Sequence, residues 1–538
     1  MGSARRQTVN FDGRDWLDRR SSGVLLHPTS LPGPFGVGDL GPEAYRFADF
    51  LARAGQSWWQ MLPVSPPGGG NSPYDSPSSF AGSWLLISLE ELARVGWVDR
   101  LWLNHPRSLA SAERALYADA IAFRMPVLRQ AYSRFQEKAP GRERERFRAF
   151  VRGNADWLSD YALYVSVKQS FGGLPWTQWP KPLRTRQRAS LREARRALAN
   201  EIGYHEFLQY QFDRQWSMLR AYCHERGIRL LGDIPMFVKH DGADTWANQR
   251  LFNLDGAGQP RVTAGVPPDY FSRSGQLWGN PVYRWKALKR IGYAWWIAKL
   301  RRALQRFDVV RLDHFIGFHR VWQVPAGAKT AKKGRFVGVP GADFLAHAGR
   351  ALGGLPFLAE DLGIVTPQVH ALRDRFRLPG MRVLAFAFDS RTSDHQPHRY
   401  PRRTVVYTGT HDNDTMVGWL SARSPEKNAG AARALREAQA RALRYAGGDG
   451  KEAHWALIRL ALMSVADLAV TPLQDMLGLG SEGRMNIPGT PSGNWEWRVR
   501  SDQLSASLAE RMAQLCADYE RVPVSTSRPG RRKQRSEG

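Results

Sequence analysis

The sequence lacks the features of secreted, membrane-spanning and disulfide-stabilised proteins. It contains two cysteines, Cys223 and Cys516, which form no disulfide framework and suit a reducing compartment. No apolar run approaches the roughly 20 residues that a membrane-spanning helix needs. The first residues, from Met1 to Arg20, are polar and charged and contain no apolar core of a signal peptide. These absences predict a globular protein of the cytoplasm.

Acidic residues are scarce relative to basic ones, with 50 Asp and Glu against 77 Lys and Arg and a formal net charge of +27. A basic excess of this size raises the hypothesis of a nucleic-acid or polyanion binder. However, the excess is mostly arginine spread over predicted helices, and it is concentrated only in the tail from Arg528 to Arg535. No zinc-finger spacing, RNP-type strand or helix-turn-helix signature accompanies it. We therefore interpret the charge as a solvated basic surface, with nucleic acid as an unlikely partner.

Eight segments share one pattern, a β-rich apolar run that ends in polar or charged residues. They are Gly23–Pro28, Trp58–Val64, Ile228–Pro235, Phe307–Phe315, Pro356–Gly363, Arg382–Asp389, Thr404–Asp412 and Asp467–Asp475. Most are separated by helical patterns, such as those of residues 42–54, 295–307, 367–377 and 426–445. Strands that alternate with helices indicate a parallel sheet, and eight such pairs predict an α/β protein with a closed (β/α)₈ TIM barrel.

The unequal distances between these strands predict large insertions. Residues 66–227 follow the second strand and residues 239–296 follow the third, and both are longer than an ordinary barrel connection. We expect them to form subdomains over the mouth of the barrel. The predicted organisation is an N-terminal extension (1–21), a catalytic barrel (22–524) that carries both insertions, and a basic, disordered tail (525–538).

Carboxylates lie at or just past the ends of five predicted strands: Asp233, Asp313, Glu360, Asp412 and Asp475. Because the active site of a (β/α)₈ barrel lies at the carboxyl ends of its strands, these side chains should meet over one mouth. Arg311 lies two residues before Asp313 and so leaves the strand from the same face. Two carboxylates, one as nucleophile and one as proton donor, are what a retaining glycosidase needs. Glu360 follows a largely apolar run, which would raise its pKa as a proton donor requires.

Other chemistries have weaker support. The acidic strand ends could bind a metal ion with His314 and His411, but no His-x-His or His-Glu-x-x-His spacing is present. A serine nucleophile would need a Gly-x-Ser-x-Gly turn, which the sequence does not contain. The glycines of the loop from Pro66 to Asp75 are followed by no Gly-Lys-Ser/Thr, so we expect a sharp loop with an aromatic tip and no phosphate site. The 20 tryptophans and 16 tyrosines suit a protein that stacks sugar rings.

A series of motifs then becomes recognisable in one order along the chain. They are Leu26-His27-Pro28-Thr29-Ser30-Leu31-Pro32, Asn71-Ser72-Pro73-Tyr74, Gly232-Asp233-Ile234-Pro235, Gly265-Val266-Pro267-Pro268-Asp269-Tyr270-Phe271, Trp278-Gly279-Asn280-Pro281, Arg311-Leu312-Asp313-His314-Phe315, Glu360-Asp361-Leu362-Gly363, Gly409-Thr410-His411-Asp412-Asn413 and Arg484-Met485-Asn486-Ile487-Pro488-Gly489. The set resembles that of the 4-α-glucanotransferases, also called amylomaltases or disproportionating enzymes, which form glycoside hydrolase family 77 of the α-amylase clan. The resemblance extends from about Ser22 to Trp497.

The resemblance implies roles for individual residues. Asp313 would be the nucleophile, Glu360 the general acid/base, and Asp412 the carboxylate that holds the sugar hydroxyls in the transition state. The substrate-binding residues that it implies are Arg311, His314, His411, Tyr74, Asp233, Trp278, Asp389, Pro268, Asp269, Tyr270 and Phe271. The loop from Gly265 to Phe271 would curl over the glucan and favour a sugar acceptor over water.

The same resemblance implies an activity and its partners. The enzyme would move α-1,4-glucan segments between maltooligosaccharides, or to glucose, without metal or organic cofactor and without a C-terminal β-sandwich. An α-1,4-glucan hydrolase on the same barrel is the alternative, because the first chemical step would be identical and only the exclusion of water in the second step would differ.

Overall fold

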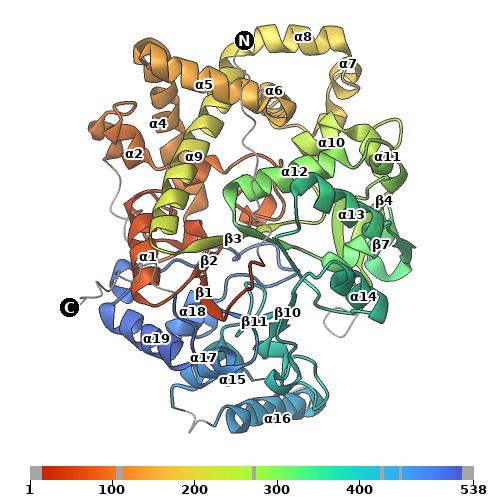
Figure 1. Cartoon of the computed structure of the whole chain (residues 1–538). Coiled ribbons are helices and arrows are strands. Elements are labelled where there is room, and N and C mark those ends of the chain that lie inside the picture. The colour runs from red at the N-terminus through yellow and green to blue at the C-terminus, as the bar shows by residue number, and fades with distance from the viewer. Residues whose placement is uncertain are drawn as a thin grey trace, which may run out of the picture.

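A nearly closed parallel barrel forms the centre of the molecule in the computed structural model, which describes residues 15–104, 109, 113–268, 274–423, 429–447 and 451–523 (Figure 1). Every pair of neighbouring strands in its eight-stranded sheet is parallel. In spatial order the strands are β10 (Gly380–Val383), β11 (Thr404–Tyr407), β12 (Leu468–Pro472), β1 (Ser21–Leu25), β2 (Trp58–Gln60), β3 (Arg229–Ile234), β6 (Val309–Leu312) and β9 (Phe357–Ala359). The predicted (β/α)₈ barrel is confirmed.

The strands are buried on both faces, which explains their continuous apolar runs. In β6 all four residues, Val-Val-Arg-Leu, are buried, including Arg311. In the neighbouring strand β3, a Cβ atom on Gly232 would lie 2.2 Å from the ring of Phe307. Only glycine therefore fits directly before Asp233, where the two strands approach each other.

Asp361 stabilises the barrel at the seam between β9 and β10, where the two end strands meet. One backbone hydrogen bond crosses this seam, from Ala359 N–H to the carbonyl of Pro379 at 2.9 Å. The fully buried carboxylate of Asp361 adds a second link, because it accepts a hydrogen bond from Met381 N–H at 2.7 Å. Its other oxygen is paired with the guanidinium of Arg373 on the covering helix. Asp361 thus joins two strands and a helix next to Glu360.

We expect Asp361→Ala to destabilise the fold strongly. Loss of one member of a buried ion pair costs about 3–5 kcal/mol. Arg373 would keep only its pair with the exposed Asp374, and Met381 N–H would lose its acceptor. The midpoint of chemical or thermal unfolding measures this loss. The control is Arg433→Ala, which removes an exposed pair with Glu437 and should leave the midpoint unchanged. An unchanged midpoint in Asp361→Ala would contradict the assigned role of the seam.

The helices that follow the strands cover the outside of the barrel. They are α1 (Pro42–Arg53), α9 (Ala199–Glu225), α12 (Ala294–Arg306), α13 (Gly341–Leu352), α14 (Pro367–Arg375), α16 (Ala429–Ala446), α17 (Ala453–Met463) and α19 (Ala506–Asp518), with short α15 (Met416–Ser421) and α18 (Leu473–Met476) near the mouth. Between β10 and β11 the structure has only two short 3-10 turns. The described chain after β12 consists of helices and loops, without a β-sandwich.

The long connection between β2 and β3 forms a helical layer on one side of the barrel (Figure 1). Its α-helices are α2 (Leu89–Arg94), α4 (Tyr117–Lys138), α5 (Gly141–Gly153), α6 (Ala155–Ser170), α7 (Lys181–Arg184) and α8 (Arg188–Ala197). Helix α9 runs from this layer down to the barrel and leads into β3. Within the described residues, none of the helices has the length and apolar character of a membrane span.

A second, antiparallel sheet lies beside the mouth. Its strands, in spatial order, are β5 (Gln276–Pro281), β4 (Val262–Val266), β7 (Arg320–Pro325) and β8 (Arg335–Gly338). Helices α10 (Ala243–Ala247) and α11 (Trp285–Arg290) lie before β4 and after β5 in the chain. Strands β4 and β5 belong to the connection after β3, whereas β7 and β8 follow β6. The pairing of β4 with β7 therefore unites segments from two different barrel connections, which the sequence pattern did not predict.

The sixth barrel strand lies earlier in the chain than predicted. The apolar run suggested a strand over 382–389, but β10 spans Gly380–Val383 and the chain then turns into a 3-10 helix, Leu384–Phe386. The N–H of Val383 donates to His395 Nδ1 at 3.1 Å, so that a side chain takes the donor that would continue the strand. Hydrophobicity alone could not predict this competition.

Candidate active site

An ion-pair network joins the carboxyl ends of β3 and β6. Arg311 donates hydrogen bonds to Asp233 at 2.6 Å and to Asp313 at 3.1 Å, as expected for residues 311 and 313 on one strand face. The hydroxyl of Tyr74 donates to the same oxygen of Asp233 at 2.7 Å. The side chains of Arg311 and Asp233 are only 6% and 1% exposed, whereas that of Asp313 is 28% exposed. The network therefore presents one carboxylate, Asp313, to the mouth.

Glu360, at the end of β9, is held by two backbone amides. The N–H of His314 donates to one carboxylate oxygen at 2.7 Å, and the N–H of Leu362 donates to the other at 3.1 Å. His314 has a left-handed backbone conformation, with φ of 49°, which is uncommon for a residue other than glycine and is often found at functional sites. The amide that directly follows Asp313 thus binds Glu360 and links the two carboxylates.

The environment of Glu360 favours its protonated form. Burial raises the pKa of this carboxyl to about 8, against the opposing charge of Arg311, and the negative charge of Asp313 adds to the rise. The direction agrees with the prediction from the apolar run before Glu360. At neutral pH Glu360 is therefore able to donate a proton.

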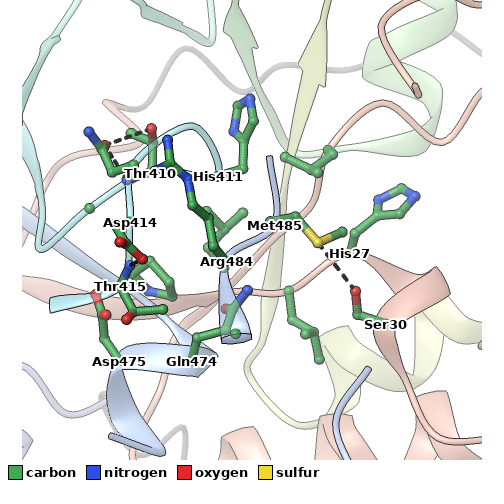
Figure 2. Close-up of a pocket in the computed structure, with 17 residues that line it drawn as sticks. His27, Ser30, Thr410, His411, Asp414, Thr415, Gln474, Asp475, Arg484 and Met485 are labelled. Atoms are coloured by element: carbon green, nitrogen blue, oxygen red, sulfur yellow. Dashed lines mark hydrogen bonds between the residues drawn. The ribbon is translucent and has the colours of Figure 1, made fainter. Parts of the chain in front are cut away.

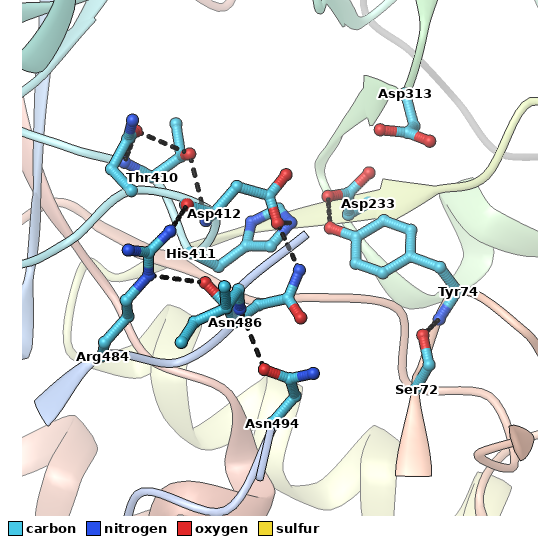
Figure 3. A network of polar contacts seen from close by, with 12 residues as sticks. Ser72, Tyr74, Asp233, Asp313, Thr410, His411, Asp412, Arg484, Asn486 and Asn494 are labelled. Atoms are coloured by element: carbon cyan, nitrogen blue, oxygen red, sulfur yellow. Dashed lines mark hydrogen bonds and ion pairs between the residues drawn. The ribbon is translucent and has the colours of Figure 1, made fainter. Parts of the chain in front are cut away.

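Asp412 lies on the other side of the mouth, after β11. Its carboxylate accepts a hydrogen bond from Asn486 Nδ2 at 2.7 Å, and the side chain is 46% exposed (Figure 3). The ring of the preceding residue, His411, stacks on Tyr74 with centroids 5.2 Å apart and lies 5.7 Å from the ring of Trp495. These rings connect Asp412 to the Asp233 network, since Tyr74 belongs to both.

The glycine-rich loop that carries Tyr74 is closed by Asp75. The carboxylate of Asp75 accepts a hydrogen bond from Gly69 N–H at 2.8 Å and pairs with Lys239 at 2.5 Å. The loop is therefore an aromatic-tipped turn, as expected, and Asp75 fixes its tip above β3.

Aromatic rings line the side of the mouth next to the small sheet. Trp278 of β5 meets His314 edge to face at 4.8 Å, and Phe237 lies 5.9 Å from Trp278. The backbone before and after Phe237 is held by three side chains. Lys299 donates to the carbonyl of Pro235 at 2.6 Å, Tyr283 to that of Met236 at 3.0 Å, and Asn280 to that of Val238 at 2.9 Å. The insertion and α12 thus shape the loop that follows β3.

Three of the predicted site residues, Asp475, Asp389 and Pro268, lie outside the network formed by Arg311, Asp313 and Glu360. Asp475 is buried and accepts hydrogen bonds from the Thr408 hydroxyl at 2.5 Å and from Met416 N–H at 2.7 Å, so it holds the loop after β11 together. Asp389 is exposed beyond the 3-10 turn that follows β10. Pro268 is exposed on the connection between β4 and β5. The predicted residues Asp269, Tyr270 and Phe271 lie outside the described residues.

A small pocket lies beneath His411, between the ends of β1, β11 and β12 (Figure 2). His27, Met485 and Arg484 line it together with Gln474. Burial lowers the pKa of His27 to about 3, and the nearby His411 adds to this effect, so the ring is neutral at ordinary pH. The pocket thus lies between His411 and the wall of the barrel.

No group of three or more His, Cys, Asp or Glu side chains with metal-binding geometry occurs among the residues that the structure describes. The imidazoles of His314 and His411, which were considered as ligands, instead pack against Trp278 and Tyr74.

Several residues of the site were missed as individual candidates. Asn486 and Arg484 lie in a recognised motif, but nothing in their spacing indicated that they bind Asp412. Phe237 and Trp495 are aromatic residues of loops, and composition alone cannot distinguish such residues from core aromatics. Asn486, Arg484 and Trp495 contact residues more than 70 positions away along the chain, and Phe237 contacts both Trp278 and the more distant His314, so only the folded structure shows these contacts.

The combination of groups suits displacement at a sugar carbon. A carboxylate beside a guanidinium, a protonated carboxyl next to it and a further exposed carboxylate across the mouth are the parts of a two-step retaining mechanism. The aromatic rings at both sides provide faces for sugar rings.

Comparisons with known proteins agree on one family. A family model described as 4-alpha-glucanotransferase matches residues 26–504. The 4-alpha-glucanotransferases of Thermus thermophilus and Synechocystis are 49% and 48% identical to this chain, and each alignment covers 94% of it and 99% of the relative. The amylomaltase of Streptococcus agalactiae, solved in complex with acarbose, superposes with a TM-score of 0.87 at 33% identity, covering 94% of this chain and all of that one.

Proposed function

The chain belongs to the 4-alpha-glucanotransferase family, and we propose that it transfers α-1,4-glucan segments from one maltooligosaccharide to another, or to glucose. The observation that carries this proposal is the arrangement of Asp313, Glu360 and Asp412 around one mouth. We further propose that the enzyme acts in the cytoplasm and that its substrates include long α-1,4-glucans.

In the first step Asp313 attacks the anomeric carbon while Glu360 protonates the oxygen of the leaving glucan. The C–O bond to the leaving chain breaks as the bond to Asp313 forms, and the sugar configuration is inverted. In the second step Glu360, now ionised, removes the proton from the hydroxyl of the acceptor sugar. That oxygen displaces Asp313 with a second inversion, so the product retains the original configuration.

The surrounding residues prepare both steps. Arg311, itself fixed by Asp233, orients Asp313 for attack, and Asp412 binds hydroxyls of the sugar at the cleavage point. We assign binding of this sugar to His314, His411 and Tyr74 as well, and stacking of the acceptor side to Trp278. Asp389, Pro268, Asp269, Tyr270 and Phe271 remain proposed contacts for more distant sugars. All of the chemistry is assigned to side chains of this chain, without a cofactor.

With maltotriose as the only substrate, we expect a ladder of longer oligosaccharides together with glucose and maltose. Transfer breaks one glycosidic bond and makes another, so the number of reducing ends should stay nearly constant. Chromatography of the products and a reducing-end assay measure the two quantities over the same time course.

A hydrolase on the same carboxylates would give a different result. Reducing ends would then rise by one for each bond cleaved and the ladder would contain only shorter products, which would contradict transfer as the main reaction. A parallel reaction with a metal chelator is the control for the assigned cofactor-free chemistry. A rate that depends on added metal would contradict that assignment.

A further inference from the structure

We propose that Arg484 is a positioning residue that fixes Asp412 for catalysis without contacting the sugar. The inference rests on the proposed function, because it assumes that Asp412 acts in the transition state. It concerns a residue that lies 72 positions after Asp412 along the chain and beyond a different barrel strand.

Arg484 binds the main chain on both sides of the contact between Asp412 and Asn486. One terminal nitrogen of its guanidinium donates to the carbonyl oxygen of Asp412 at 2.8 Å, and Nε donates to the carbonyl oxygen of Asn486 at 2.8 Å (Figure 3). Asn486 in turn donates to the carboxylate of Asp412 at 2.7 Å. The three residues therefore form a closed group in which Arg484 sets the distance between the other two.

The segment that carries Asn486 is itself held by hydrogen bonds. The N–H of Trp495 donates to the carbonyl of Met485 at 2.7 Å, and the N–H of Ile487 donates to Asn494 Oδ1 at 2.9 Å. These bonds close the segment from residue 485 to 495 into a loop with fixed ends. Arg484 links this loop to the segment after β11 by its hydrogen bond to Asp412, whereas β11 itself pairs with β10 and β12.

Asp412 needs such support because its side chain is 46% exposed at the mouth. Apart from Asn486, the group near its carboxylate is His411, whose Nε2 lies 3.5 Å from Oδ1. A displacement of about 1 Å at a reacting group can lower a rate by about 10²-fold. Loss of the guanidinium should therefore lower kcat more than it changes KM, since a contact made mainly in the transition state is weakened.

A planar guanidinium is suited to this task. Its donors have a fixed geometry that reaches two acceptors at once, whereas the ammonium group of lysine is a single point of charge on a flexible stem. Lysine at this position should satisfy one carbonyl oxygen and leave the other to solvent. The Lys variant should therefore restore part of the rate, which a role confined to filling the pocket beneath His411 would not predict.

The test compares Arg484→Met, Arg484→Lys and a matched control in the purified full-length enzyme. The control is Arg500→Met, because Arg500 is half exposed and binds Asp502 on the surface of the same C-terminal segment. We expect kcat for maltotriose disproportionation to fall about 30–100-fold in Arg484→Met and about 3–10-fold in Arg484→Lys, with KM changed less than about threefold in both. Arg500→Met should keep the kcat and KM of the unmodified enzyme.

Melting temperatures, measured in parallel, separate misfolding from misplacement. If Arg484→Met does not fold, a folded Arg484→Lys enzyme with reduced kcat and unchanged KM supports the inference, and one with full kcat overturns it. A rise in KM at constant kcat in either variant also overturns it, as does a kcat of Arg484→Met equal to that of the control.

Asp412→Asn distinguishes this inference from the proposed function. If Asp412→Asn is inactive while both Arg484 variants keep full kcat, only the role of Arg484 fails. If Asp412→Asn keeps its kcat within about tenfold, the role proposed for Asp412 fails, and the inference about Arg484 is overturned with it.

Discussion

Asp313→Asn is expected to lower kcat/KM for maltotriose by about 10⁴-fold or more. The amide has nearly the shape of the carboxylate but cannot form the covalent bond to the sugar. Arg311 would keep its contact with Asp233 at 2.6 Å, so the strand end should remain in place and the loss should be chemical. Steady-state kinetics with a coupled glucose assay measure the loss of activity. The melting temperature shows whether the folded structure is preserved.

Asp308→Asn is the matched control for this variant, because Asp308 directly precedes the same strand at its opposite end. Asp308 pairs with Arg220 at 2.6 Å and with His224 at 2.9 Å, away from the mouth. Its substitution should affect stability more than turnover. A loss below about 10²-fold in Asp313→Asn would remove Asp313 as the nucleophile.

Glu360→Gln is expected to lower kcat/KM for maltotriose by about 10²–10⁴-fold, the usual contribution of a general acid/base. The effect should depend on the leaving group. A maltosyl fluoride donor needs little protonation to depart, so the first step should largely survive with this substrate, while the second step still lacks its base. Rates of Glu360→Gln with maltotriose and with maltosyl fluoride therefore separate an effect on proton transfer from an effect on sugar binding. An equal loss with both donors in a pre-steady-state burst would contradict the role as acid.

The pH dependence follows from the raised pKa of Glu360, which burial places at about 8. The acid form is required in the first step, so the rate should fall as pH rises through about 8, and Glu360→Gln should lack this alkaline limb.

The same raised pKa affects stability. In the folded state the Glu360 carboxyl is protonated at pH values where the carboxyl of the unfolded chain is ionised. Its stabilising contribution is complete below the ordinary pKa of glutamate and is lost as pH rises through about 8. Relative to the unmodified enzyme, Glu360→Gln should therefore gain melting temperature at pH 8–9 and not at pH 4.

The eight barrel strands were predictable because each is a short apolar run with burial on both faces, and because four of them have a carboxylate in or after their carboxyl end. Asp233 lies near the end of β3, Asp313 and Glu360 directly follow β6 and β9, and Asp412 lies in the loop after β11. The position of the sixth strand was not, since His395 takes the N–H of Val383 and ends the strand earlier than hydrophobicity suggests. The four-stranded sheet beside the mouth was also missed. The paired residues of its strands β4 and β7 are 57 to 63 positions apart in the chain, and such pairing leaves no local signal.

The sequence by itself determined which chemical groups the mouth could contain, because a barrel brings whatever follows its strands to one end. Tertiary structure decided what each group does. Asp233 and Asp313 have the same side chain, but contact with Arg311 and Tyr74 buries the first and leaves the second open to the mouth. Glu360 has its raised pKa because burial and Asp313 act on it together, and Asp412 is held by residues more than 70 positions away. Burial, charge and hydrogen bonding depend on distances in space, and those distances exist only once the chain has folded.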